Sequence, residues 1–240
     1  MTRFFVMQPE TRLVRGNVVP RFWIALFVAA AATISAAGSI SGQTIEMMKF
    51  VYRLSGPDFE ENSSASKAIT LYKAGDKYSR IEYPPDPITG DHIVGITKEP
   101  DAWTINLDKH TADHVLDAGP TFIARTPVIW SAQKGIGPGI EEFFKELEFG
   151  NEASFFQQNH PKDAGTRKID GKDVKGLSLK NGAREVTLYL DSNTGKPLQI
   201  DVVKDGKPEI SVHYISYETK LAFDPALFEI PEGLKITDRK

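Results

Sequence analysis

The sequence predicts a mainly β domain, organised around an antiparallel meander between Glu185 and Gly233. Apolar and polar residues alternate along three runs of this stretch, and a period of two residues is typical of strands with one buried face. The alternating apolar positions are Val186, Leu188, Leu190, Leu198, Ile200, Val202, Ile210, Val212 and Tyr214. Turn-forming residues separate the runs at 191–197 and at 205–206, so consecutive strands reverse direction and pair antiparallel.

Residues 1–42 are predicted to be a signal peptide and leader that precede the folded domain. Basic residues before position 22 form an n-region, an apolar run beginning at Phe22 forms an h-region, and Ser35-Ala36-Ala37 supplies small residues for a peptidase. The apolar run is about 11 to 16 residues long, whereas a helix that spans a bilayer needs about 20. We therefore expect cleavage between positions 37 and 42 and a periplasmic or otherwise extracytoplasmic protein; an uncleaved anchor is the alternative.

The composition limits the chemistry and the partners of the chain. None of the 240 residues is cysteine, which excludes disulfides and thiolate chemistry and indicates a domain held together by core burial. Residues 1–42 carry four basic residues and one acidic residue, so the remainder has 25 basic against 31 acidic residues and a net charge of −6. This charge argues against nucleic acid and an anionic membrane surface as partners, so we expect membrane contact only through partners.

The first part of the domain reads as a series of strands and turns. Alternating apolar residues predict strands over 46–54, 68–73, 78–83, 92–97, 102–107 and 113–116. A polar loop covers 55–66, and prolines between positions 84 and 87 end the third strand because proline cannot donate to a ladder. Gly75-Asp76 and Pro100-Asp101 are typical of the turns that join such strands.

Helical periodicity interrupts the strands after a glycine-rich loop. Apolar residues recur at spacings of three and four over 140–147, which predicts an amphipathic helix. Phe155-Phe156 indicates a second, short helical turn, followed by a loop over 159–166. Residues 168–171 and 175–179 form the arms of a hairpin. With the meander, the prediction amounts to about ten or eleven strands and one or two helices.

No catalytic constellation is present in the sequence. His110 and His114 lie four residues apart, but the residues between them read as a hairpin turn, which argues against a zinc site. No serine lies in a nucleophile elbow, and the glycines at 135–139 are not followed by the lysine of a phosphate-binding loop. A carboxylate pair for glycoside hydrolysis among the loop aspartates between Asp86 and Asp101 is the enzyme alternative. We expect a non-enzymatic protein without a metal or cofactor.

A set of apolar residues, many of them aromatic, is assigned to inward-facing positions. Two interpretations stay open, because these residues either fill an ordinary core or line a cavity for an acyl chain. Burial contributes about 0.8 kcal/mol per CH₂ group without fixed polar contacts, which suits a lipid ligand. The predicted cavity residues are Tyr83, Trp103, Ile105, Phe122, Trp130, Phe143, Phe144, Leu188, Ile200, Val212 and Tyr214. Their faces follow from strand parity alone, so a register shift of one residue would invert each strand's contribution.

Three parts of the chain carry a resemblance to a known family. They are Leu71-Tyr72-Lys73 with Tyr78-Ser79-Arg80-Ile81-Glu82-Tyr83-Pro84, then Asp101-Ala102-Trp103-Thr104-Ile105-Asn106-Leu107, and finally Thr194-Gly195-Lys196-Pro197-Leu198 with Phe223-Asp224-Pro225-Ala226-Leu227-Phe228 and Glu229-Ile230-Pro231-Glu232-Gly233. By their order and spacing, the chain from Phe50 to Ile236 resembles the outer-membrane lipoprotein carrier (LolA-like) superfamily of periplasmic lipoprotein-sorting proteins. The resemblance implies one domain over 43–240, with a curved antiparallel sheet that forms an unclosed, or half, β-barrel. It also implies that one or two helices cover an apolar cavity that receives lipid.

The resemblance favours an exported lipid-binding or lipoprotein-handling protein, whose partners are a lipid or an acylated lipoprotein and, as a further class, envelope proteins. Two departures accompany it. Only residues 43–48 could supply the carriers' first helix, and Lys73-Ala74-Gly75 falls where carriers keep an arginine that faces the cavity, so that arginine is absent or displaced. The alternative is an envelope protein-interaction or regulatory module with a filled core and an exposed strand edge or loop as its binding surface. An enzyme would require acidic or histidine side chains that converge in one cleft.

Overall fold

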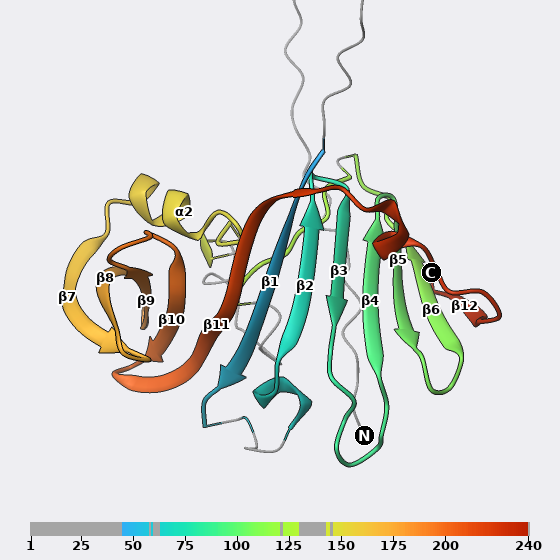
Figure 1. The fold of residues 1–240 in the computed structure, drawn as a ribbon, viewed down its shortest axis with the longest axis horizontal. Helices are drawn as coiled ribbons and strands as arrows, with labels where there is room; N and C mark the ends of the chain where they lie inside the picture. The colour runs from blue at the N-terminus through green and yellow to red at the C-terminus, as the bar shows by residue number, and fades with distance from the viewer. Residues whose placement is uncertain are drawn as a thin grey trace, which may run out of the picture. The chain divides into compact units, whose positions relative to one another are not determined.

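The structure is a computed structural model that describes residues 45–57, 59, 63–120, 122–129, 143–144 and 146–239. The predicted signal peptide and leader over 1–42 lie outside the described residues, and so do the glycine-rich loop at 135–139 and Trp130. The part of the chain from Ile45 onward is built on a single sheet (Figure 1).

Twelve strands of the described residues form this sheet, in the order β12-β6-β5-β4-β3-β2-β1-β11-β10-β9-β8-β7. They are β1 (Glu46–Ser55), β2 (Ile69–Ala74), β3 (Tyr78–Glu82), β4 (Ile93–Lys98), β5 (Asp101–Asn106), β6 (Thr111–Leu116), β7 (Lys162–Ile169), β8 (Lys172–Asn181), β9 (Arg184–Asp191), β10 (Pro197–Lys204), β11 (Lys207–Ala222) and β12 (Lys235–Arg239). Neighbours are antiparallel except β12 and β6, which are parallel. Because β12 and β7 are edges that do not pair with each other, the sheet is open, which confirms the predicted mainly β, unclosed half-barrel.

The open sheet curves, as Figure 1 shows. Strands β7 to β10 curl round on one side, α2 (Glu152–Gln158) lies across the end of this curl, and β1 to β6 continue the sheet on the other side. Two short 3-10 turns, η1 (Ser64–Ser66) and η3 (Pro225–Phe228), accompany α2 in the described residues. The predicted second helical turn is confirmed, because Phe155-Phe156 lies within α2.

The prediction of a loop over 159–166 is wrong, because β7 already begins at Lys162. The first seven residues of β7 are exposed, so no alternation of buried and exposed positions marks the strand in the sequence. Its backbone pairs with β8, and a register shift between Asp163 and Gly165 interrupts the ladder. The strand therefore exists through main-chain pairing rather than through burial of its side chains.

The helix predicted over 140–147 lies mostly outside the described residues, but its end differs from the prediction. Phe143 and Phe144 are helical, whereas Leu147 is not. The Val128 amide donates to the Leu147 carbonyl at 2.9 Å, and the Phe149 amide donates to the Thr126 carbonyl at 3.0 Å. This segment is extended because its backbone pairs with residues 126–128 instead of continuing a helix.

The sheet buries apolar side chains on both of its faces. We call the inner face the one that carries Phe50, Leu188 and Val212, and the outer face the one that carries Ile96 and Ile105. The inner cluster joins strands β1, β2 and β8 to β11 to α2 and to the segment before it. The outer cluster lies mainly on β1 to β6, under the C-terminal segment.

Residues 223–234, the C-terminal segment, cross the outer face and cover the outer cluster (Figure 1). The Phe228 side chain is 1% exposed and its ring centroid lies 5.3 Å from that of Tyr78. The Arg80 guanidinium donates to the Leu227 carbonyl at 3.2 Å. The C-terminal segment thus covers the outer face at β3 and β4.

Candidate functional site: the inner face of the sheet

The inner face of β8 to β11 is filled by side chains. The register places Leu188, Ile200 and Val212 side by side on neighbouring strands, and each of the three is fully buried. Phe149, from the segment before α2, adds its ring to this layer, and its centroid lies 4.6 Å from that of Tyr52. Among the described residues, this half of the inner face is therefore a packed core.

A carboxylate lies inside the packed half. Glu152, the first residue of α2, is fully buried, and its oxygens accept hydrogen bonds from the Tyr214 hydroxyl at 2.7 Å and the Tyr217 hydroxyl at 2.8 Å. The Gly150 amide donates to the same carboxylate at 3.0 Å. Burial raises the pKa of Glu152 although these donors act to lower it, and burial together with the nearby carboxylate raises the pKa of both tyrosines. The hydrogen bonds of this cluster connect α2 to β11.

The inner face of β4 to β6 differs from the packed half. Its side chains are mostly small or polar, and among the described residues they are half-buried or, at Thr104, exposed. They are Ile93, Gly95, Thr97, Ala102, Thr104, Asn106, Thr111, Asp113 and Val115. The Ile81 side chain lies against Gly95, where an added Cβ would come within 2.8 Å of its Cγ2 atom. The apolar packing of the inner cluster thus reaches β3 and becomes thinner beyond it.

A network of ion pairs lies beside β2 on the inner face. Lys73 and Arg125 both pair with Glu148, whose side chain is 8% exposed. Arg125 Nη1 lies 3.0 Å from Glu148 Oε1 and 3.1 Å from Glu146 Oε2. Burial acts to raise the pKa of Glu148, but Lys73, the Thr126 amide and Arg125 outweigh it and lower the pKa. The ammonium group of Lys73 is therefore paired with a carboxylate.

The structure divides the predicted cavity residues among several places. The inner cluster receives Tyr83, Phe143, Phe144, Leu188, Ile200, Val212 and Tyr214. Trp103 and Ile105 lie on the outer face instead, where the Trp103 ring stacks on His114 with centroids 5.0 Å apart. Phe122 is 40% exposed, and Trp130 lies outside the described residues. The sequence interpretation did not include Glu148 and Glu152, the acidic residues at the centres of the two polar clusters.

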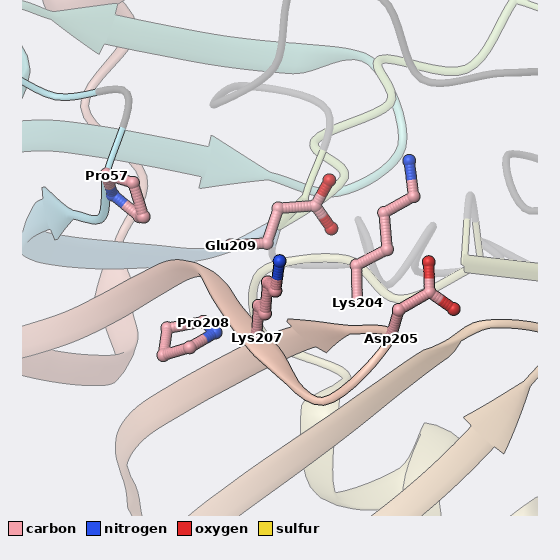
Figure 2. A pocket seen from close by; sticks show the side chains of 6 residues that line it. All are labelled: Pro57, Lys204, Asp205, Lys207, Pro208 and Glu209. Atoms are coloured by element: carbon pink, nitrogen blue, oxygen red, sulfur yellow. The ribbon is translucent and has the colours of Figure 1, made fainter.

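Figure 2 shows a depression at the turn between β10 and β11. Its volume is about 300 Å³, and its lining residues are Pro57, Lys204, Asp205, Lys207, Pro208 and Glu209. Glu209 also accepts a hydrogen bond of 2.7 Å from Arg184. Because two ammonium groups and two carboxylates share the lining, the depression has no excess charge that would select an ionic ligand.

The described residues contain no group of three or more histidine, aspartate or glutamate side chains placed to hold a metal ion. The His114 ring instead bonds to Asp101 and Asp238, each at 2.8 Å. No helix within the described part of the chain combines the length and the apolar character needed to cross a membrane.

Comparisons with known proteins found likenesses among solved structures, whereas no family model and no curated protein matches the sequence. An uncharacterized conserved protein from Thermus thermophilus is 9% identical, with a TM-score of 0.45 over 80% of this chain and 90% of that one. The Pseudomonas aeruginosa MucA/MucB complex gives 10% identity and a TM-score of 0.41 over 80% of this chain and 58% of the other.

An outer membrane lipoprotein-sorting protein domain from Vibrio parahaemolyticus is also among these structures. It is 11% identical, with a TM-score of 0.33 over 78% of this chain and 90% of that chain. That domain is described as lipoprotein-sorting, which is the class of protein that this sequence resembles. At such identities and TM-scores, these likenesses carry no argument about a ligand or an activity.

Proposed function

We propose that this protein is an exported, non-enzymatic lipid-binding or lipoprotein-handling protein that holds acyl chains against the inner face of its half-barrel. One observation supports the proposal above others: the inner face is packed at β8 to β11, whereas at β4 to β6 its side chains are mostly small or polar and only half-buried or exposed. A chain laid over these strands would complete their burial. Ten buried CH₂ groups contribute about 8 kcal/mol before the cost of association is subtracted.

The proposed acyl-binding site begins at Ile81 and Tyr83, where the packed inner cluster ends, and extends across Thr97 and Ala102. The apolar side chains along it, Ile81, Tyr83 and Ala102, need no fixed polar contact with the ligand, which suits an acyl chain better than a polar metabolite.

Replacing Thr97 with phenylalanine is expected to weaken the binding of a fluorescent acyl probe at least tenfold, a loss of about 1.4 kcal/mol. The ring would occupy the inner face of β4, where the acyl chain is proposed to lie. Thr187→Phe is the matched control, because Thr187 is also a half-buried threonine in mid-strand but lies on the outer face of β9. The measurement is a probe titration of the delipidated chain, with thermal unfolding to verify that both variants fold.

Two results of this titration would contradict the proposal. Absence of saturable probe uptake by the unmodified chain would contradict lipid binding itself. An equal loss of affinity in the Thr97 and Thr187 variants would contradict the inner face as the binding site. Native mass spectrometry of the chain, gently extracted from its own envelope, supplies an independent readout, since the proposal expects a bound mass that matches a phospholipid or an acylated peptide.

The second candidate function is an envelope protein-interaction or regulatory module, which is favoured by the dry packing of Leu188, Ile200 and Val212. In that case the exposed edge strand β7 would offer its free backbone groups to a partner strand. An apo mass that does not change when lipid is added, together with a protein partner recovered from envelope extracts, would favour this module over the lipid-binding protein.

A further inference from the structure

Strand β12 differs from the other strands of the described sheet. It pairs parallel to β6, with Lys235 opposite Thr111 and Arg239 opposite Val115, and all five of its residues are exposed. Ile236, its one apolar residue, is 51% exposed. The strand is therefore attached by its backbone and by polar side chains, without the apolar burial that fixes the strands at the centre of the sheet.

The side chains of β12 make specific ionic contacts with β6. Arg239 donates from Nε and Nη2 to the two oxygens of Asp113, at 3.0 and 3.1 Å, which is a bidentate pair. Asp238 Oδ1 lies 2.8 Å from His114 Nδ1, and His114 Nε2 lies 2.8 Å from Asp101. These ionic contacts accompany the observed register of β12 on β6.

The segment before β12 can extend without disturbing most of the outer cluster. Phe228, the buried last residue of η3, anchors the chain on the outer face. Residues 229–234 follow it, with a proline at 231 and a glycine at 233 whose φ of 77° is in the left-handed region. We call residues 229–234 the hinge. Half-buried Ile230 and Leu234 contact the outer cluster, so extending the hinge exposes only these two apolar side chains of the segment. Fully extended, the six residues span about 20 Å.

We propose that the edge of β6 that pairs with β12 is a strand-addition site, and that it also accepts β12 from a second copy of this chain. Two chains would then exchange their β12 strands. The contacts to Asp113 and His114 are the same whether β12 comes from its own chain or from another. The equilibrium between the two forms then depends on the hinge and on protein concentration. When the exchange is reciprocal, the backbone groups along the edge of β6 are hydrogen-bonded in both chains, and the dimer is closed with twofold symmetry.

Two charge-reversed variants test the exchange, Asp113→Arg and Arg239→Glu. In either variant alone, pairing β12 with β6 places two like charges opposite each other, because positions 113 and 239 then carry charges of the same sign. In a mixed dimer, however, the arginine introduced at position 113 meets the glutamate introduced at position 239, and the native pair forms at the other site. Mixing the two variants is therefore expected to yield mixed dimers in native mass spectra, at about fivefold or more over either homodimer. The double variant Asp113→Arg/Arg239→Glu restores the pairing within one chain and controls for folding.

A second measurement uses the unmodified sequence. Equal amounts of isotopically light and heavy chain, mixed at high concentration, are expected to give light–heavy dimers, and a chain that ends at Leu234 is expected to give none. Mixed species that persist in the truncated chain would place the contact elsewhere and overturn the proposal. Absence of mixed dimers up to the solubility limit, both here and with the charge-reversed pair, would also overturn it.

Discussion

Replacing Phe149 with alanine is expected to lower the free energy of unfolding by about 3–5 kcal/mol, because the variant leaves a cavity in the packed half of the inner face. The side chain is 1% exposed. Its ring centroid lies 4.6 Å from Tyr52, 5.6 Å from Phe50 and 5.8 Å from Tyr214. It therefore touches both β1 and β11. Chemical denaturation at neutral pH measures the loss.

Phe122→Ala is the matched control for this prediction, since it removes the same atoms from a side chain that is 40% exposed. Its effect is expected to stay within about 1 kcal/mol, because less apolar surface is buried at the start. Equal losses at Phe149 and Phe122 would contradict the conclusion that the inner cluster is a tightly packed core. The same two variants also test whether probe binding at β4 to β6 depends on the rigidity of the packed half.

The central meander was predictable because one buried face gives a clear period of two. Leu188, Ile200 and Val212 lie on one face in the structure as their alternation predicts. The same reasoning places Trp103 and Ile105 together on β5, and they do share a face. Parity cannot say which cluster a face joins, however, and here the C-terminal segment covers a second apolar face. Trp103 and Ile105 therefore belong to the outer cluster.

The edge strands and the buried carboxylates left weaker signals in the sequence. All five β12 residues and the first seven of β7 are exposed, so no alternation of buried and exposed positions marks these strands in the sequence. Glu152 lies in the first turn of a short helix, where an acidic residue is ordinarily solvated and favoured by the helix dipole. Its burial depends on Tyr214 and Tyr217, which lie more than sixty residues later in the chain. Contacts at such separations do not appear in a local pattern.

Removing the Glu152 carboxylate is expected to lower the free energy of unfolding by about 2–5 kcal/mol in a Glu152→Ala variant. The hydroxyls of Tyr214 and Tyr217 would lose their shared acceptor inside the core, and each unsatisfied buried group costs about 1–3 kcal/mol. Combining this change with Tyr214→Phe and Tyr217→Phe removes the orphaned hydroxyls. The triple variant is therefore expected to be more stable than Glu152→Ala alone. If the losses simply add, the three side chains do not act as one hydrogen-bonded unit.

Glu152→Gln separates the charge of this side chain from its shape, and its effect is expected to depend on pH. Burial raises the pKa of Glu152 in the folded chain above its ordinary value of 4.5, so the folded state holds the proton more tightly than the unfolded state. The resulting stabilisation is fully present below the unfolded-state pKa and is lost as the pH rises through the raised folded-state pKa. Because glutamine does not titrate, the variant should gain stability relative to the unmodified chain as the pH rises through that window. Glu148, whose pKa is lowered, acts in the opposite sense but is common to both chains, so it cancels in the difference. Denaturation curves that keep a constant separation from pH 4 to pH 8 would show that the buried Glu152 carboxylate does not titrate with a raised pKa.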